Sequence, residues 1–195
     1  MRSVFAISLL CLVVLPAAAS AQPAAGGSAP LAVQEPASRL DQLFTALKRA
    51  GSEQAAQRIS TRIRQEWSRS GSASIDLLMQ WAQKAADEEK NDVAMDLLDQ
   101  VVVLAPAYAE GWNRRATLHY AMEDYAKSMA DIGRALQLEP RHFGALGGMA
   151  VILRDSGRKD AAMRAYQRLL DVYPMMRNAQ TELGKLADEA AGQKI

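Results

Sequence analysis

The sequence predicts an all-α fold: an α-solenoid of stacked antiparallel helical hairpins, closed by a C-terminal capping helix. Three prolines, Pro106, Pro140 and Pro174, recur at a constant spacing of 34 residues. The positions between them repeat as well, with small residues where two helices must approach and large apolar residues at helical spacing. A period of this length is typical of helical hairpins that bury their apolar faces only by stacking on their neighbours.

Three repeat units follow from this spacing, at residues 75–108, 109–142 and 143–176. The eighth position of each unit is alanine, and the twentieth is also small, which predicts close contact between the two helices of a hairpin. Each unit is expected to contain a first helix, a short turn, and a second helix that ends at the proline. The turns are predicted at residues 89–91, 123–125 and 157–159.

At this point the chain resembles the tetratricopeptide repeat (TPR) family over residues 75–176. The resemblance is carried by Trp112, Ala116, Tyr120, Asp124, Tyr125, Ala135, Leu136, Leu138, Glu139 and Pro140 in the central unit, and by Gly157, Ala162, Tyr166 and Pro174 in the third. Arg115 and His119 depart from the family pattern, which usually has Leu and Tyr there. We expect them to loosen the contact between the two helices of that unit. Trp112 is expected to be buried between the first and second units.

The first residues have the layout of a cleaved signal peptide, residues 1–21. Arg2 precedes an apolar run from Val4 to Leu15, and Ala19-Ser20-Ala21 supplies a cleavage site before Gln22. The only cysteine lies inside this run, so the mature chain is expected to lack thiols and disulfides. These features predict an exported protein of the bacterial periplasm.

The segments around the repeats have distinct compositions. Residues 22–36 are rich in Ala, Pro and Gly and predict a flexible linker. Residues 37–74 carry two apolar stripes separated by Gly51-Ser52, which predicts a degenerate N-terminal helical hairpin. We expect this hairpin to cover the outer face of the helices at 75–104. Residues 177–190 predict an amphipathic capping helix.

The charge balance argues against nucleic acid as a partner. Of the 23 basic and 22 acidic residues, Arg2 leaves with the signal peptide, so 22 remain of each. Residues 37–74 hold seven basic and three acidic side chains, net +4, and residues 75–108 hold two and seven, net −5. Two interpretations stay open: attraction between these neighbouring segments, or an asymmetric surface that orients a charged partner.

No catalytic constellation, cofactor motif or metal site is evident, and the sequence predicts a protein that is not an enzyme. His119 and His142 are not at the spacing of a metal pair, and each is expected to be structural. Gly144, Gly147 and Gly148 lack the Lys and Ser/Thr of a phosphate-binding loop. No cofactor is expected.

The TPR resemblance implies a concave groove, lined by the first helix of each unit, that binds a protein or peptide segment. Carried over position by position, the groove residues are Gln80, Gln83, Asn113, Arg114, Thr117, Tyr120, Gly144, Gly147, Gly148 and Val151. One TPR subclass grips a C-terminal carboxylate with Lys, Asn and Arg at fixed positions. Of that set only Arg114, beside Asn113, is present here.

Two functions are consistent with these observations. The first is a non-enzymatic periplasmic adaptor that binds a segment of an envelope protein in the groove. The alternative is a self-associating structural scaffold, in which Tyr173, Met175 and Met176 leave apolar surface at the C-terminal end of the stack. The basic N-terminal hairpin is a further candidate surface for a partner or for a membrane.

Overall fold

The computed structural model describes residues 38–192, and in this part of the chain every regular element is an α-helix. The predicted signal peptide and linker lie outside the described residues. The helices are α1 Arg39–Lys48, α2 Glu53–Trp67, α3 Ala73–Asp87, α4 Asn91–Leu104, α5 Ala109–Ala121, α6 Tyr125–Leu138, α7 Phe143–Asp155, α8 Lys159–Val172 and α9 Arg177–Gly192.

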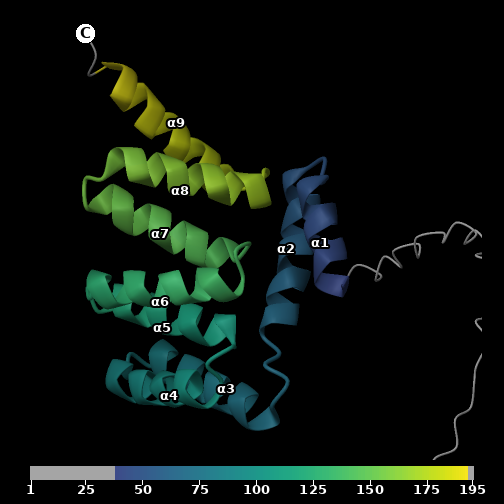
Figure 1. Cartoon of the computed structure of the whole chain (residues 1–195), viewed down its shortest axis with the longest axis vertical. Coiled ribbons are helices and arrows are strands. Elements are labelled where there is room, and N and C mark those ends of the chain that lie inside the picture. Colours follow the sequence, from purple (N-terminus) through teal and green to yellow (C-terminus); the bar gives the residue numbers. More distant parts are fainter. Residues whose placement is uncertain (1–37, 193–195) are drawn as a thin grey trace, which may run out of the picture. The chain divides into compact units, whose positions relative to one another are not determined.

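Helices α3 to α8 form three antiparallel hairpins that stack in chain order, and α9 packs against α8 at the end of the stack (Figure 1). The predicted all-α repeat fold is therefore confirmed. The first helix of each hairpin is α3, α5 or α7, and these three helices line one side of the stack. This arrangement positions the candidate binding groove described below.

The ends of the helices follow from local sequence. Each repeat proline stands two residues after the last residue of α4, α6 or α8, where its ring and missing N–H prevent the helix from continuing. The turns within the hairpins occur at the predicted places, and one residue in each adopts a left-handed conformation. These residues are Glu89, Glu123 and Gly157, with φ angles of 59°, 60° and 71°. Only the third turn has the glycine that this conformation favours.

The small residues of the repeat are buried where helices meet, as predicted. Ala82, Ala116 and Ala150 are at most 2% exposed, and Ser128 donates its hydroxyl hydrogen to the Ala116 carbonyl, 2.8 Å away. The core has two parts. One joins α3, α4 and one residue of α5, and the larger one joins the later helices to α1 and α2.

The N-terminal hairpin is not where we expected it. Instead of covering the outer face of α3 and α4, α1 and α2 lie across the ends of the later helices (Figure 1). The indole of Trp67 stacks on His142 with ring centroids 4.1 Å apart, and it also contacts Phe143 at 4.8 Å. The aromatic face of the hairpin therefore packs against the aromatic residues that begin α7.

The ion pairs of the hairpin do not show the attraction to residues 75–108 that was one of the two open interpretations. Its ion pairs to other elements use its acids: Asp41 pairs with Arg141 at 2.6 Å and Glu53 with Arg177 at 2.9 Å. Arg141 also lies over the ring of Phe44, 4.2 Å from its centroid. The loop between the second and third repeats supplies Arg141, and the start of α9 supplies Arg177, which helps explain why the hairpin docks there.

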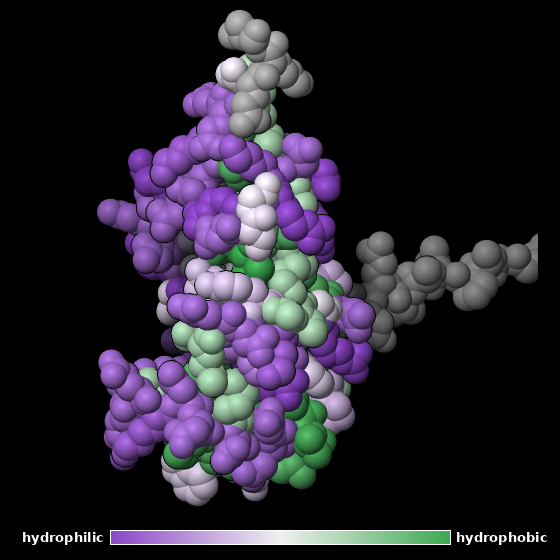
Figure 2. All heavy atoms as spheres, turned by 90° about the vertical axis from the view of Figure 1, so that its left-hand side faces the viewer, coloured by the Kyte–Doolittle hydropathy of each residue, from purple (hydrophilic) through white to green (hydrophobic). Residues whose placement is uncertain are grey.

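The outer face of the first repeat consequently stays open to solvent. Leu77 and Trp81 are 41% and 51% exposed. One repeat later the same positions are Gly111 and Arg115, and both are covered by the preceding helix α4. A Cβ on Gly111 would lie 2.8 Å from a methyl group of Val101, and Arg115 binds Asp99 at 2.8 Å. Figure 2 shows apolar surface at this end of the stack.

Two expectations about the central repeat are wrong. Arg115 does not loosen the hairpin, because it donates two hydrogen bonds of 2.7 Å to the buried carboxylate of Asp131 on α6. His119 is buried beside the same carboxylate, with 3.8 Å between Nε2 and an Asp131 oxygen. Trp112 is half-buried rather than buried, since its indole N–H donates to the Pro106 carbonyl and so keeps one ring edge near the surface.

The C-terminal end of the stack is covered, contrary to the apolar surface that we expected there. Tyr173 is buried, and Met175 and Met176 pack against the larger core cluster. Helix α9 buries Ala179 and Leu186 and leaves its polar residues outward.

Candidate binding groove

Three pockets lie between neighbouring first helices of the repeats. Two of them are between α3 and α5 and share Met79, Gln83 and Arg114, so they form one cleft with volumes of about 190 and 480 Å³. The third, of about 150 Å³, lies between α5 and α7. Thr117 on α5 borders the cleft on one side and the third pocket on the other. The three pockets form a groove across α3, α5 and α7.

The structure brings nine of the ten predicted groove residues to these pockets. Gln80, Gln83 and Arg114 line the cleft, and Thr117 lines both sides. The residues at the α5–α7 pocket are Asn113, Tyr120, Gly144, Gly148 and Val151.

Gly147 is the exception. A Cβ at this position would point toward Leu169 of α8, 3.8 Å from its methyl group, so Gly147 faces its own hairpin partner. Gly144 and Gly148 are four residues apart and share the groove face of α7, whereas Gly147 lies on the adjoining face. Its inclusion among the predicted groove residues is not supported by this geometry.

Some lining residues were missed at the level of sequence. Leu98 of α4 and Ile132 of α6 reach the groove from the second helices of their repeats. Asp76 and Asp87 lie at the edge of the α3–α5 cleft with Gln80 and Gln83. The spacings of four, three and four residues among these four polar side chains place them on one face of α3, which is a signal that the sequence does carry.

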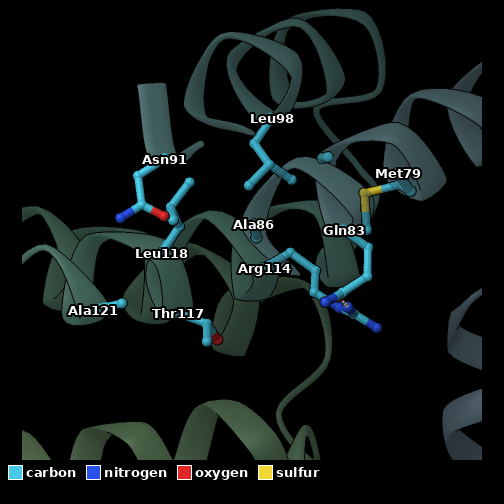
Figure 3. A pocket seen from close by; sticks show the side chains of 10 residues that line it. Met79, Gln83, Ala86, Asn91, Leu98, Arg114, Thr117, Leu118 and Ala121 are labelled. Carbon is cyan, nitrogen blue, oxygen red and sulfur yellow. Dashed lines mark hydrogen bonds between the residues drawn. The ribbon is translucent and has the colours of Figure 1, made fainter. Parts of the chain in front are cut away.

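A buried polar network fixes the centre of the groove. Glu110 of α5 accepts hydrogen bonds from Arg114 at 2.6 Å and from Asn113 at 3.1 Å. Burial raises the pKa of Glu110, but its hydrogen bonds with His142 and Arg114 outweigh this effect and hold the pKa below its usual value. Glu110 is therefore a carboxylate at neutral pH. Arg114 also donates to Gln83 of α3, which it meets in the α3–α5 cleft (Figure 3).

His142 connects this network to the N-terminal hairpin. Its side chain is 1% exposed, and its Nδ1 accepts a hydrogen bond from the Ala145 backbone N–H at 3.2 Å. Nε2 consequently carries the hydrogen that is donated to Glu110 at 3.0 Å. The indole of Trp67 stacks on the face of the same imidazole ring. His142 therefore has a structural role, because it holds α5, the start of α7 and the hairpin together.

Among residues 38–192, no three His, Cys, Asp or Glu side chains gather as a metal site would require. None of the helices in this range is both long and apolar enough to cross a membrane. The arrangement is suited to holding an extended chain by apolar pockets and hydrogen bonds.

Comparison with known proteins agrees with this geometry. The family model for the tetratricopeptide repeat matches residues 109–142. A TPR repeat-containing protein of Rhizobium etli is 52% identical over 163 residues, which cover 84% of this chain and 80% of that protein.

Solved structures of similar fold include the first TPR of Spaghetti (RPAP3) bound to an HSP90 peptide. Its TM-score is 0.57 at 20% sequence identity, and the match covers 60% of this chain and 93% of that one. MamA protein has a TM-score of 0.56 and 16% identity, with coverage of 78% of this chain and 81% of that one. From its repeats, its groove and its Rhizobium etli relative, we conclude that the chain belongs to the tetratricopeptide repeat family.

Proposed function

We propose that this protein is a non-enzymatic adaptor that binds a segment of another protein in the groove across α3, α5 and α7. The observation that carries the proposal is the pair of apolar pockets on either side of Thr117, aligned along the first helices of the repeats. The related fold of RPAP3 holds a peptide, which supports the same kind of partner here. The buried Glu110 network pre-organises the groove, so less ordering free energy is lost on binding.

The signal-peptide pattern of residues 1–21 supports a periplasmic location, and we propose that the partner is an envelope protein. The absence of cysteine after residue 21 suits that compartment because no thiol is left to oxidise.

The variant Thr117→Arg tests groove binding. Thr117 is exposed and borders both pockets, so a long cationic side chain there should block both. In pull-downs from an envelope fraction, we expect Thr117→Arg to lose partners that the wild type retains. The matched control is Thr181→Arg, which makes the same change at an exposed position on α9. Identical partners for all three proteins, with circular dichroism showing folded baits, would count against groove binding.

The open face of the first repeat favours a second candidate function, self-association. Leu77 and Trp81 occupy positions that a preceding helix covers in the next repeat, so a second copy could bury them in a symmetric pair. In sedimentation velocity over a range of concentrations, we expect a reversible dimer that Trp81→Glu abolishes. Tyr125→Glu, on the exposed surface of α6, should leave the dimer intact. A wild-type protein that is monomeric at every concentration would eliminate this candidate.

A further inference from the structure

Two basic residues line the groove, and the one that the sequence predicts there, Arg114, is already paired. The guanidinium of Arg114 is already bound to Glu110 at 2.6 Å and to Gln83. The other basic residue of the pockets, Lys84, points into solvent with 75% of its side chain exposed and approaches Glu88 at 4.0 Å. A carboxylate that approached Arg114 would therefore have to displace Glu110 from a pair that Asn113, His142 and Gln83 hold in place.

The α3 side of the groove is instead acidic. The pockets are lined by three acids, Asp76, Asp87 and Glu110, and by two bases, Lys84 and Arg114. The net charge of these five side chains is −1. Glu110 is paired, but the other two acids bind neutral groups: Asp87 accepts from the Gln83 amide at 2.7 Å and Asp76 from the Ser70 backbone N–H at 2.8 Å. Within the described residues neither forms an ion pair, so both carboxylates can receive a cation from a ligand.

Several observations support the acidic character of this side. Hydrogen bonds from Ser70 hold the pKa of Asp76 below its usual value, so the group is charged at neutral pH. The whole first repeat, residues 75–108, has two basic and seven acidic side chains. Such a field attracts cationic segments and repels anionic ones before contact.

The α3–α5 and α5–α7 pockets, of about 190 and 150 Å³, also have apolar residues in their linings. The α3–α5 pocket contains Met79, Leu98 and Leu118, and the α5–α7 pocket contains Ile132 and Val151. In a polyproline II conformation, side chains three residues apart point the same way and are about 9 Å apart. Two apolar side chains that point the same way can therefore enter the two pockets, which border each other at Thr117.

We infer that the groove selects an extended segment with two apolar side chains three residues apart and a lysine or arginine beside the one that enters the α3–α5 pocket. Acidic segments are disfavoured. This inference rests on the proposed function and adds the chemistry of the partner.

Fluorescence anisotropy with three labelled peptides tests the inference on the full mature chain. The first peptide is Leu-Pro-Ala-Leu flanked by two arginines, and the second is the same core flanked by two glutamates. The third is the arginine peptide with both leucines replaced by serine. We expect the arginine peptide to bind at least tenfold more tightly than either of the others at low salt, and its advantage over the glutamate peptide to shrink as salt is added.

Charge reversal provides the matched comparison. The double variant Asp76→Lys/Asp87→Lys should reverse the preference between the arginine and glutamate peptides. Asp160→Lys/Asp171→Lys, which makes the same charge change at exposed positions on α8, should leave it unaltered. Asp87→Lys alone, at an exposed position, should reduce the preference if the double variant does not fold.

The outcomes separate this inference from the proposed function. Equal binding of the arginine and glutamate peptides, abolished in both cases by Thr117→Arg, would overturn the charge selectivity and leave groove binding intact. Binding of none of the peptides would overturn the inferred pattern, and groove binding would then depend on the pull-down result alone. A preference for the glutamate peptide would overturn the inference outright.

Discussion

Replacing Trp67 with alanine is expected to lower the free energy of unfolding by about 3–5 kcal/mol, a large share of the stability of a typical domain. Trp67 is only 8% exposed and lies among Phe44, His142 and Phe143. Truncation would leave a cavity where the N-terminal hairpin meets the second and third repeats. It would also remove the stacking partner that covers His142.

Trp81 provides a matched control for this prediction, because it is the same residue type at a half-exposed position. Trp81→Ala is expected to change stability by only about 0.5 kcal/mol, in the range of surface substitutions. Urea denaturation of the two variants and the wild type, followed by circular dichroism, gives the comparison. Equal losses for Trp67→Ala and Trp81→Ala would mean that the hairpin does not dock on the later repeats.

The second large effect is expected at Asp131. Asp131→Ala should destabilise the protein by about 3–5 kcal/mol, because it removes one partner of a buried ion pair and leaves the other charge uncompensated. Asp131 is 4% exposed and receives both hydrogen bonds from Arg115 at 2.7 Å. The remaining partner of Arg115, Asp99, is more than half exposed and cannot replace a buried carboxylate.

The double variant Arg115→Leu/Asp131→Leu separates the loss of a pair from the loss of packing. Buried ion pairs can often be exchanged for apolar residues at little cost, so most of the stability lost in Asp131→Ala should return. Leucine is also the residue that the TPR family usually has in place of Arg115. A double variant as unstable as Asp131→Ala would contradict this account, as would an unchanged melting temperature for Asp131→Ala.

The sequence contains enough information to predict the repeat fold and most of the groove. The 34-residue spacing of Pro106, Pro140 and Pro174 locates the hairpins, and the small residues between them identify where helices touch. Groove residues such as Thr117 and Tyr120 come from the TPR resemblance, carried over position by position onto the repeats. Gly147 shows the limit of this reasoning, since a shift of one position along a helix turns a side chain by about 100° and changes which neighbour it meets.

The docking of the N-terminal hairpin could not be predicted in the same way. An apolar stripe such as that of α2 shows that a face is buried, but not which other surface covers it. The choice depends on the stacking of Trp67 on His142 and on the pairing of Asp41 with Arg141, and neither pair has a periodic relation in sequence. The same is true of Arg115, whose compensating partner lies 16 residues away on another helix.

The position of the hairpin has a consequence for how the protein folds. In an ordinary solenoid each unit contacts only its neighbours, so contacts are local and units can unfold one after another from the ends. Here Asp41 meets a residue 100 positions further along the chain and Glu53 one 124 positions away. Closing loops of this length costs chain entropy and slows folding, but it also ties the second repeat, the third repeat and the cap into a single cooperative unit. The small core of the first repeat, which includes one residue of α5, is separate from the larger core that contains the hairpin. The half of the groove that α3 contributes is therefore the part that can open independently, before the rest of the protein unfolds.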